Sequence, residues 1–146
     1  MTEYVVDASV AVKWYLDEEG TAMAVALFNV IEQPLVPDHF FAEFGNVLWK
    51  HWRRQLLNRG RVEDILGAIQ DLPFRVRSSR DLLPTAAYIA VDHGITVYDA
   101  LYVALGVESG VSVVTADRQL RNVMAATPIR SMVLHLDDLS GDELGT

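Results

Sequence analysis

Residues 96–117 read TVYDALYVALGVESGVSVVTAD, and this stretch carries the strongest evidence for the fold class. Its nearly all-apolar part, 97–108, has the length of a helix and ends at Gly110. Residues 111–115 are rich in β-branched side chains and predict a buried strand. Asp117 stands just beyond that strand. A helix that leads into a strand ending near an acid is typical of an α/β sheet.

The same alternation of helices and strands continues on both sides of this stretch. The predicted strands are 4–6, 35–36, 74–76 and 132–136, and the predicted helices are 8–16, 20–31, 38–57, 62–72, 81–93 and 118–125. Strands separated by helices need crossover connections, which favour a mainly parallel sheet with helices on both faces. We therefore expect an α/β fold, a three-layer α/β/α sandwich, formed by residues 1–136. Residues 137–146 are expected to form an acidic, mobile tail.

Composition narrows the class of protein. The chain has 146 residues, 51% of them hydrophobic, which suits one compact domain. It has no cysteine, which excludes disulfides, thiolate metal sites and cysteine nucleophiles. The longest apolar run, 22–28, is much shorter than the roughly 20 residues of a membrane-spanning helix. The first basic residue, Lys13, lies behind a predicted strand, so no secretory signal is expected and we predict a cytoplasmic location.

Charge is unevenly distributed along the chain. The net charge of −8 argues against a nucleic-acid partner, because cationic side chains supply most of the affinity for phosphates. Residues 50–80, however, hold eight basic and only three acidic residues. This segment is either an anion-binding flank beside an acidic site or a set of solvated helix faces. Trp49 and Trp52 lie next to its first basic residues and are expected to be core or interface residues, with base stacking as the alternative.

Acidic residues mark the ends of predicted strands. Asp7 follows strand 4–6, Asp117 follows strand 111–115, and Asp99 lies in the first turn of the helix after Thr96. If the strands are neighbours, these carboxylates converge on one crevice, and Glu43 on the long helix could face it too. Carboxylates held close together repel unless a cation compensates them. Oxygen ligands favour Mg²⁺, with Mn²⁺ as a substitute, and such a cation suits phosphodiester hydrolysis.

Each acid also has an ordinary structural explanation. Asp is a preferred helix cap, which accounts for Asp7 and Asp117, and Asp99 completes a capping box with Thr96. Four histidines show no metal-ligand spacing and are expected to be surface or hydrogen-bonded side chains: His39, His51, His93 and His135. No glycine-rich nucleotide-binding loop follows a predicted strand.

Four segments of the chain together resemble a known family. They are Val5-Val6-Asp7-Ala8-Ser9, Glu43-Phe44-Gly45-Asn46-Val47-Leu48, Tyr98-Asp99-Ala100-Leu101-Tyr102-Val103-Ala104 and Val114-Thr115-Ala116-Asp117-Arg118-Gln119-Leu120. In order and spacing these segments resemble the four signature blocks of PIN-domain ribonucleases. The length of the chain and its Asp-x-Ser opening look most like the VapC toxins of toxin-antitoxin pairs.

The resemblance implies an α/β/α domain that cleaves RNA internally with Mg²⁺ or Mn²⁺. It implies a catalytic pocket of Asp7, Glu43, Asp99 and Asp117, in which Asp7, Asp99 and Asp117 hold the metal. Ser9 and Thr115 would then be supporting hydroxyls. It further implies a homodimer silenced by an antitoxin whose tail enters the groove.

Two other functions fit acids at strand ends. A phosphate-accepting signalling domain also gathers acids around magnesium, but it needs a lysine after a later strand. This chain has no lysine after Lys50. A non-catalytic module that binds a basic partner through its acids is the second alternative.

Overall fold

A five-stranded parallel sheet forms the centre of the molecule. The computed structural model describes residues 3–139, 141 and 143–144. The strands are β1 (Val5–Val6), β2 (Leu35–Pro37), β3 (Arg75–Arg77), β4 (Val113–Thr115) and β5 (Val133–His135). Their order is β3-β2-β1-β4-β5, and every neighbouring pair is parallel. The carboxyl ends of all these strands therefore lie at one edge of the sheet.

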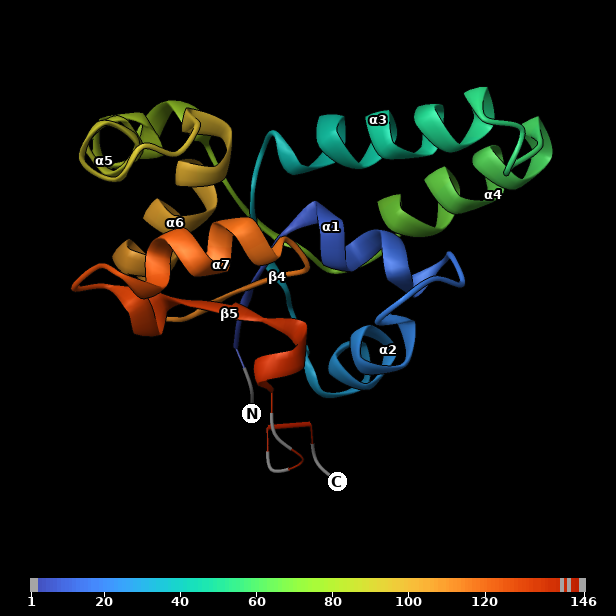
Figure 1. Cartoon of the computed structure of the whole chain (residues 1–146). Helices are drawn as coiled ribbons and strands as arrows, with labels where there is room; N and C mark the ends of the chain where they lie inside the picture. Colours follow the sequence, from blue (N-terminus) through green and yellow to red (C-terminus); the bar gives the residue numbers. More distant parts are fainter. Residues whose placement is uncertain (1–2, 140, 142, 145–146) are drawn as a thin grey trace.

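Helices cover both faces of the sheet. They are α1 (Ala8–Ala11), α2 (Thr21–Val30), α3 (Phe40–Arg53), α4 (Arg59–Gln70), α5 (Ser79–His93), α6 (Val97–Ser109) and α7 (Arg118–Ala125), with 3₁₀ turns η1 (Val12–Trp14), η2 (Arg130–Met132) and η3 (Leu136–Asp138). Right-handed crossovers place α1–α4 on one face and α5–α7 on the other, because the chain reverses its direction across the sheet after β3. Figure 1 shows α1 and α2 on the opposite side of the strands from α6. The predicted α/β sandwich with a parallel sheet is confirmed.

Helix α6 lies at the centre of the core. It packs against β1, β2 and β4, and residues 100–106 are all buried. This environment explains why its sequence is apolar on nearly every side. Gly106 permits the close approach to β4, since a Cβ there would lie 2.8 Å from the carbonyl oxygen of Val111.

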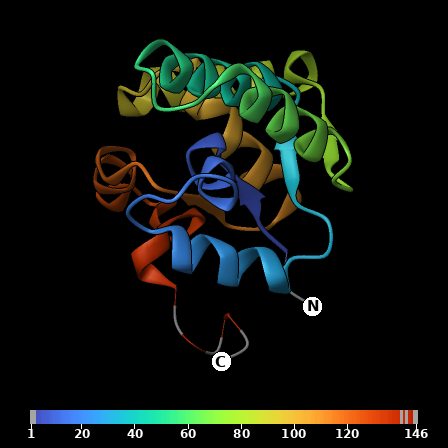
Figure 2. The ribbon, with the colours of Figure 1, turned by 90° about the vertical axis from the view of Figure 1, so that its right-hand side faces the viewer.

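The boundary between α3 and α4 differs from the prediction. The sequence pattern placed these helices at 38–57 and 62–72, but α3 ends at Arg53 and α4 begins at Arg59. Gln55 has a left-handed backbone (φ 61°) that reverses the chain. Asn58, expected near the end of the first helix, caps the second by accepting a hydrogen bond from the Arg61 backbone N–H. Figure 2 shows the two helices side by side in the upper part of the molecule.

The segment after β5 is partly packed. Residues Leu136–Asp138 form η3, and Leu139 and Leu144 are buried. Residues 140, 142 and 145–146 of the expected mobile tail lie outside the described residues, so a separate tail from 137 stays a prediction. No described helix is long and apolar enough to cross a bilayer.

Candidate active site

Asp7 lies at the junction of β1 and α1, where its backbone N–H bonds to the Val114 carbonyl of β4. It occupies the N-cap position of α1, but its side chain caps nothing. Instead, its Oδ2 accepts hydrogen bonds from Ser9 Oγ at 2.9 Å and Thr115 Oγ1 at 2.7 Å. Burial raises the pKa of this carboxyl group, and the two hydroxyl groups oppose that rise.

The two hydroxyl groups form a directed network around Asp7. Ser9 Oγ accepts from the Ala116 backbone N–H at 3.0 Å, and Thr115 Oγ1 accepts from the Asp117 backbone N–H at 3.0 Å. Because a backbone N–H can only donate, each hydroxyl keeps its own hydrogen for the carboxylate. Both predicted supporting hydroxyls therefore contact Asp7.

Asp99 and Asp117 line the same small pocket. They share a hollow of about 200 Å³ with side chains of α7 and with residues of the α5–α6 loop. Asp99 is half-buried in the first turn of α6, where Thr96 Oγ1 accepts from its backbone N–H at 3.1 Å. Asp117 is exposed, and its Oδ1 caps α7 by accepting from the Gln119 and Leu120 backbone N–H groups.

Glu43 approaches this edge from the first turn of α3. Tyr102 of α6 donates its phenol hydrogen to Glu43 Oε1 over 2.6 Å. His39 Nε2 lies 3.3 Å from the same oxygen. Burial raises the pKa of the Glu43 carboxyl group, with a further rise from Asp7, while the Tyr102 hydrogen bond opposes it.

The structure brings all four acids to one electrostatic neighbourhood. The pKa of Asp99 rises to about 6, first because of burial and then because of the negative charges of Asp7, Asp117 and Glu43. Asp117 likewise contributes to the raised pKa of Asp7. These mutual effects indicate that the carboxylates lie within electrostatic range of one another, with Asp7 and Asp117 following the neighbouring strands β1 and β4.

The donor set fits a hard cation in its chemistry. All four groups are carboxylates, neighbouring hydroxyls add oxygen atoms, and the chain has no sulfur from cysteine. Their repulsion is the kind that a divalent cation relieves. Within the described part of the chain, no three His, Asp or Glu side chains already stand together as a complete ligand group.

Comparison with protein families gives a match over most of the chain. The model of the PIN domain matches residues 4–125. The chain belongs to the PIN domain family. This PIN domain is 36% identical over 118 residues to Ribonuclease VapC3 of Pyrobaculum aerophilum, covering 80% of this chain and 90% of that protein.

Solved structures agree with this PIN fold. A crystal structure of PAE2754 from Pyrobaculum aerophilum aligns with a TM-score of 0.74 at 25% identity, covering 99% of this chain and 91% of the other. A toxin-antitoxin complex from Klebsiella pneumoniae contains a chain that aligns with a TM-score of 0.63 at 13% identity, covering 93% of this chain and 99% of that one. The second likeness shows the fold alone.

Two residues of the PIN domain site were missed by sequence reasoning. His39 was expected to be a surface or satisfied side chain, yet its ring lies between Glu43 and the Tyr98 carbonyl. Burial lowers its pKa, which favours the neutral ring. Tyr102 contacts Glu43 directly, and its place three residues after Asp99, on the same face of α6, was the available signal.

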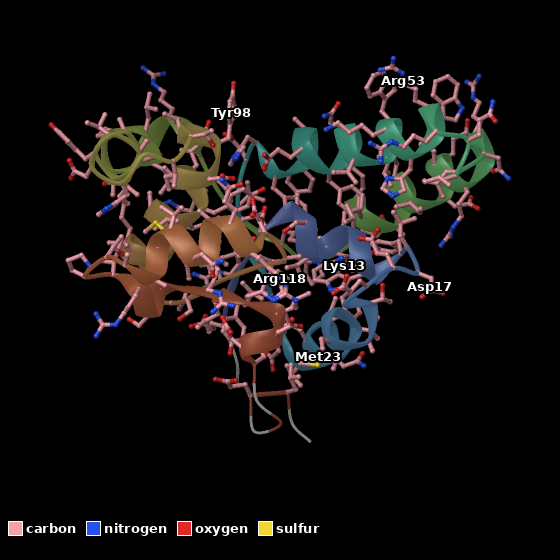
Figure 3. All side chains as sticks on the ribbon, viewed as in Figure 1. Lys13, Asp17, Met23, Arg53, Tyr98 and Arg118 are labelled. Atoms are coloured by element: carbon pink, nitrogen blue, oxygen red, sulfur yellow. The ribbon has the colours of Figure 1, made fainter. Side chains whose placement is uncertain are left out.

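The basic segment of the PIN domain divides into two regions. Arg75 and Arg77 of β3 pair with Glu3 and Glu108 at 3.0 and 3.2 Å, away from α3. The other region is the far end of α3 and the start of α4. Among the described residues, Lys50, Arg53 and Arg54 form no ion pair there, and Arg53 stacks over the Trp49 ring at 5.4 Å. Figure 3 shows Arg53 at the opposite end of α3 from Tyr98.

Proposed function

We propose that this PIN domain is an endoribonuclease that hydrolyses RNA phosphodiester bonds as the toxin of a toxin-antitoxin pair. The observation that supports the proposal is the position of three acids: Asp7 and Asp117 follow the neighbouring strands β1 and β4, and Asp99 lines the same hollow as Asp117. The 36% identity to a VapC ribonuclease supports the same activity.

Each acid has a distinct proposed role. Asp7, Asp99 and Asp117 would hold Mg²⁺, with Mn²⁺ able to substitute. The cation would neutralise charge that develops on the phosphate and lower the pKa of water. Glu43 would position or deprotonate the attacking water. Ser9 and Thr115 would hold Asp7 in one orientation through their hydrogen bonds to Oδ2.

The basic end of α3 would hold RNA at a distance from the cleavage point. Lys50 and Arg53 lie about 10 and about 15 Å along α3 from Glu43, and Arg54 follows at its C-cap. Their positive charges would contact phosphates flanking the scissile bond. Trp49 and Trp52 are 47% and 50% exposed, so they offer faces on which bases can stack.

The two alternative functions differ from this proposal in specific features. A phosphate-accepting domain needs a lysine after a late strand, but β5 ends at His135 and continues into Leu136–Asp138. Lys13 instead pairs with Glu18 at 3.0 Å. A non-catalytic acidic module predicts metal or peptide binding without any RNA cleavage.

An antitoxin and a second copy of the chain are the proposed partners. The antitoxin would place a basic side chain against the acids, because a guanidinium group can compensate carboxylates through paired hydrogen bonds. Inhibition by the co-expressed antitoxin tests the first partner. Light scattering of the purified protein tests the homodimer by its mass.

The decisive experiment follows RNA cleavage after metal removal. The full chain is purified, treated with a chelator, and assayed on total RNA without metal and with added Mg²⁺, Mn²⁺ or Ca²⁺. We expect no cleavage without metal and restored cleavage with Mg²⁺ or Mn²⁺. Metal-independent cleavage that survives substitution of the acids would contradict the site assignment, and a complete lack of cleavage would favour the interaction module.

A further inference from the structure

The phenol group of Tyr102 connects two helices that carry candidate site acids. Its ring belongs to α6, three residues after Asp99, and the residue is only 1% exposed. Its hydroxyl reaches Glu43 of α3.

The direction of this hydrogen bond follows from the two groups that form it. An ionised carboxylate oxygen can only accept, so the phenol of Tyr102 donates its hydrogen to Glu43 Oε1, at 2.6 Å. A short bond of this kind to a carboxylate is a strong one.

The ring of His39 lies beside the same oxygen. Its Nε2 lies 3.0 Å from the Tyr98 carbonyl, which can only accept, so Nε2 carries the ring hydrogen. The Nε2 atom is also 3.3 Å from Glu43 Oε1. Within the described part of the chain, no side chain or backbone group donates to Oε2.

We propose that Tyr102 is a positioning residue of the nuclease site, which holds the Glu43 carboxylate by Oε1 and leaves Oε2 as the oxygen that receives the attacking water. This role rests on the proposed function. The His39 ring packs beside this contact, 4.9 Å from the Tyr102 ring, and in this role Tyr102 does not touch the substrate. When one carboxylate oxygen is held in a hydrogen bond, the other oxygen has a fixed position. A fixed acceptor is needed to orient a water molecule for attack.

The first test separates catalysis from binding. Tyr102→Phe keeps the ring and removes only the hydroxyl, and Tyr15→Phe is the matched control, because no described group bonds to the Tyr15 hydroxyl. We expect Tyr102→Phe to lower kcat about 10- to 100-fold with little change in KM. Tyr15→Phe should match the wild type in both constants.

A double-mutant cycle and a spectroscopic measurement test the route of the effect. If Tyr102 acts through Glu43, the double variant Tyr102→Phe, Glu43→Gln should be no slower than Glu43→Gln alone. In metal-free wild-type protein, ¹H NMR should show a slowly exchanging, strongly downfield hydroxyl proton. That signal should vanish in Tyr102→Phe and move upfield in Glu43→Gln.

The possible outcomes separate the two proposals. Normal kcat in Tyr102→Phe, additive effects in the cycle, or no downfield signal in the wild type would overturn the positioning role alone. If Tyr102→Phe fails to fold, the NMR comparison of the wild type with Glu43→Gln still tests the Tyr102–Glu43 hydrogen bond. Absence of RNA cleavage by the wild type would overturn the proposed function itself.

Discussion

Thr115 Oγ1 donates a hydrogen bond to Asp7 Oδ2 over 2.7 Å, although the two residues are 108 positions apart in the chain. The contact exists because β1 and β4 are parallel neighbours, with Val6 beside Val114. Thr115 is completely buried, and it also accepts from the Asp117 backbone N–H. One hydroxyl therefore bonds to two of the candidate acids, to the side chain of Asp7 and to the backbone of Asp117. It can do so only because β1 and β4 are neighbours in the sheet.

Removal of this hydroxyl should destabilise the protein. Thr115→Val keeps the shape but leaves the buried Asp7 carboxylate and the Asp117 N–H each short of one partner. We expect a loss of about 1–3 kcal/mol in the free energy of unfolding. Urea denaturation measures it, with Thr85→Val on α5 as the control. Equal stability of the two variants would mean that the hydrogen bond contributes nothing.

The charge of Asp7 should be essential for cleavage. Asp7→Asn keeps the size of the side chain but removes a negative charge from the proposed metal ligands. We expect RNA cleavage to fall by a factor of about 10² to 10⁴, with the folded structure retained. Asp92→Asn, an exposed change on α5, should cleave at the wild-type rate. Wild-type activity in Asp7→Asn would remove Asp7 from the site.

The stability of the metal-free protein should depend on Asp99 in a defined pH window. Its folded-state pKa is about 6, above the usual 3.8, because of burial and neighbouring negative charges. The folded state therefore binds this proton more tightly than the unfolded state does. The resulting stabilisation is complete below pH 3.8 and is lost as the pH rises through about 6.

Thermal unfolding of wild type and Asp99→Asn at several pH values measures this effect. The two proteins should have similar Tm values near pH 4, and the Asn variant should be the more stable near pH 7.5. Added Mg²⁺ should raise the Tm of the wild type at pH 7.5 more than that of the variant. A Tm difference that is independent of pH would contradict the raised pKa.

The close packing of α6 against β4 should not tolerate a side chain at position 106. Gly106→Ala would place a Cβ 2.8 Å from the Val111 carbonyl oxygen and 3.0 Å from Val113 Cγ2. We expect a loss of about 1–3 kcal/mol in unfolding free energy. The control is Gly67→Ala in α4. A Cβ at this position would meet no neighbouring atom within 4 Å, so the change should stabilise the protein by up to about 1 kcal/mol. Similar effects at the two positions would argue against the close approach.

The basic end of α3 should affect RNA binding more than chemistry. Replacement of Lys50 and Arg54 by Gln should raise KM for RNA and reduce its salt dependence, while kcat stays near the wild-type value. Arg130→Gln, an exposed change far along the chain on η2, serves as the control. A fall in kcat without a change in KM would place these residues in another role.

Local sequence patterns were sufficient for the sheet and for three of the acids. Runs such as 111–115 are β-branched and apolar, and the position of an acid just after such a run depends only on neighbouring residues. Asp117 and Thr96 also cap α7 and α6, as their positions predicted, whereas Asp7 does not cap α1. The apolar neighbours of Glu43 indicated that its carboxylate lies near a buried surface. Whether the carboxylate faces the site depends on the rotation of α3 about its axis, which the sequence does not determine.

Contacts between residues far apart in the sequence could be seen only in the tertiary structure. The basic run from 50 to 80 looks continuous in the sequence, yet β3 carries Arg75 and Arg77 away to pair with Glu3 and Glu108. Tyr102 is one apolar-face residue among many in α6 until the packing of α3 brings Glu43 to its hydroxyl. Periodicity and strand-end position are properties of adjacent residues, and they predicted the fold and pointed to the candidate acids. Which donors meet those acids depends on strand order and helix packing, because these bring together side chains that no local pattern relates.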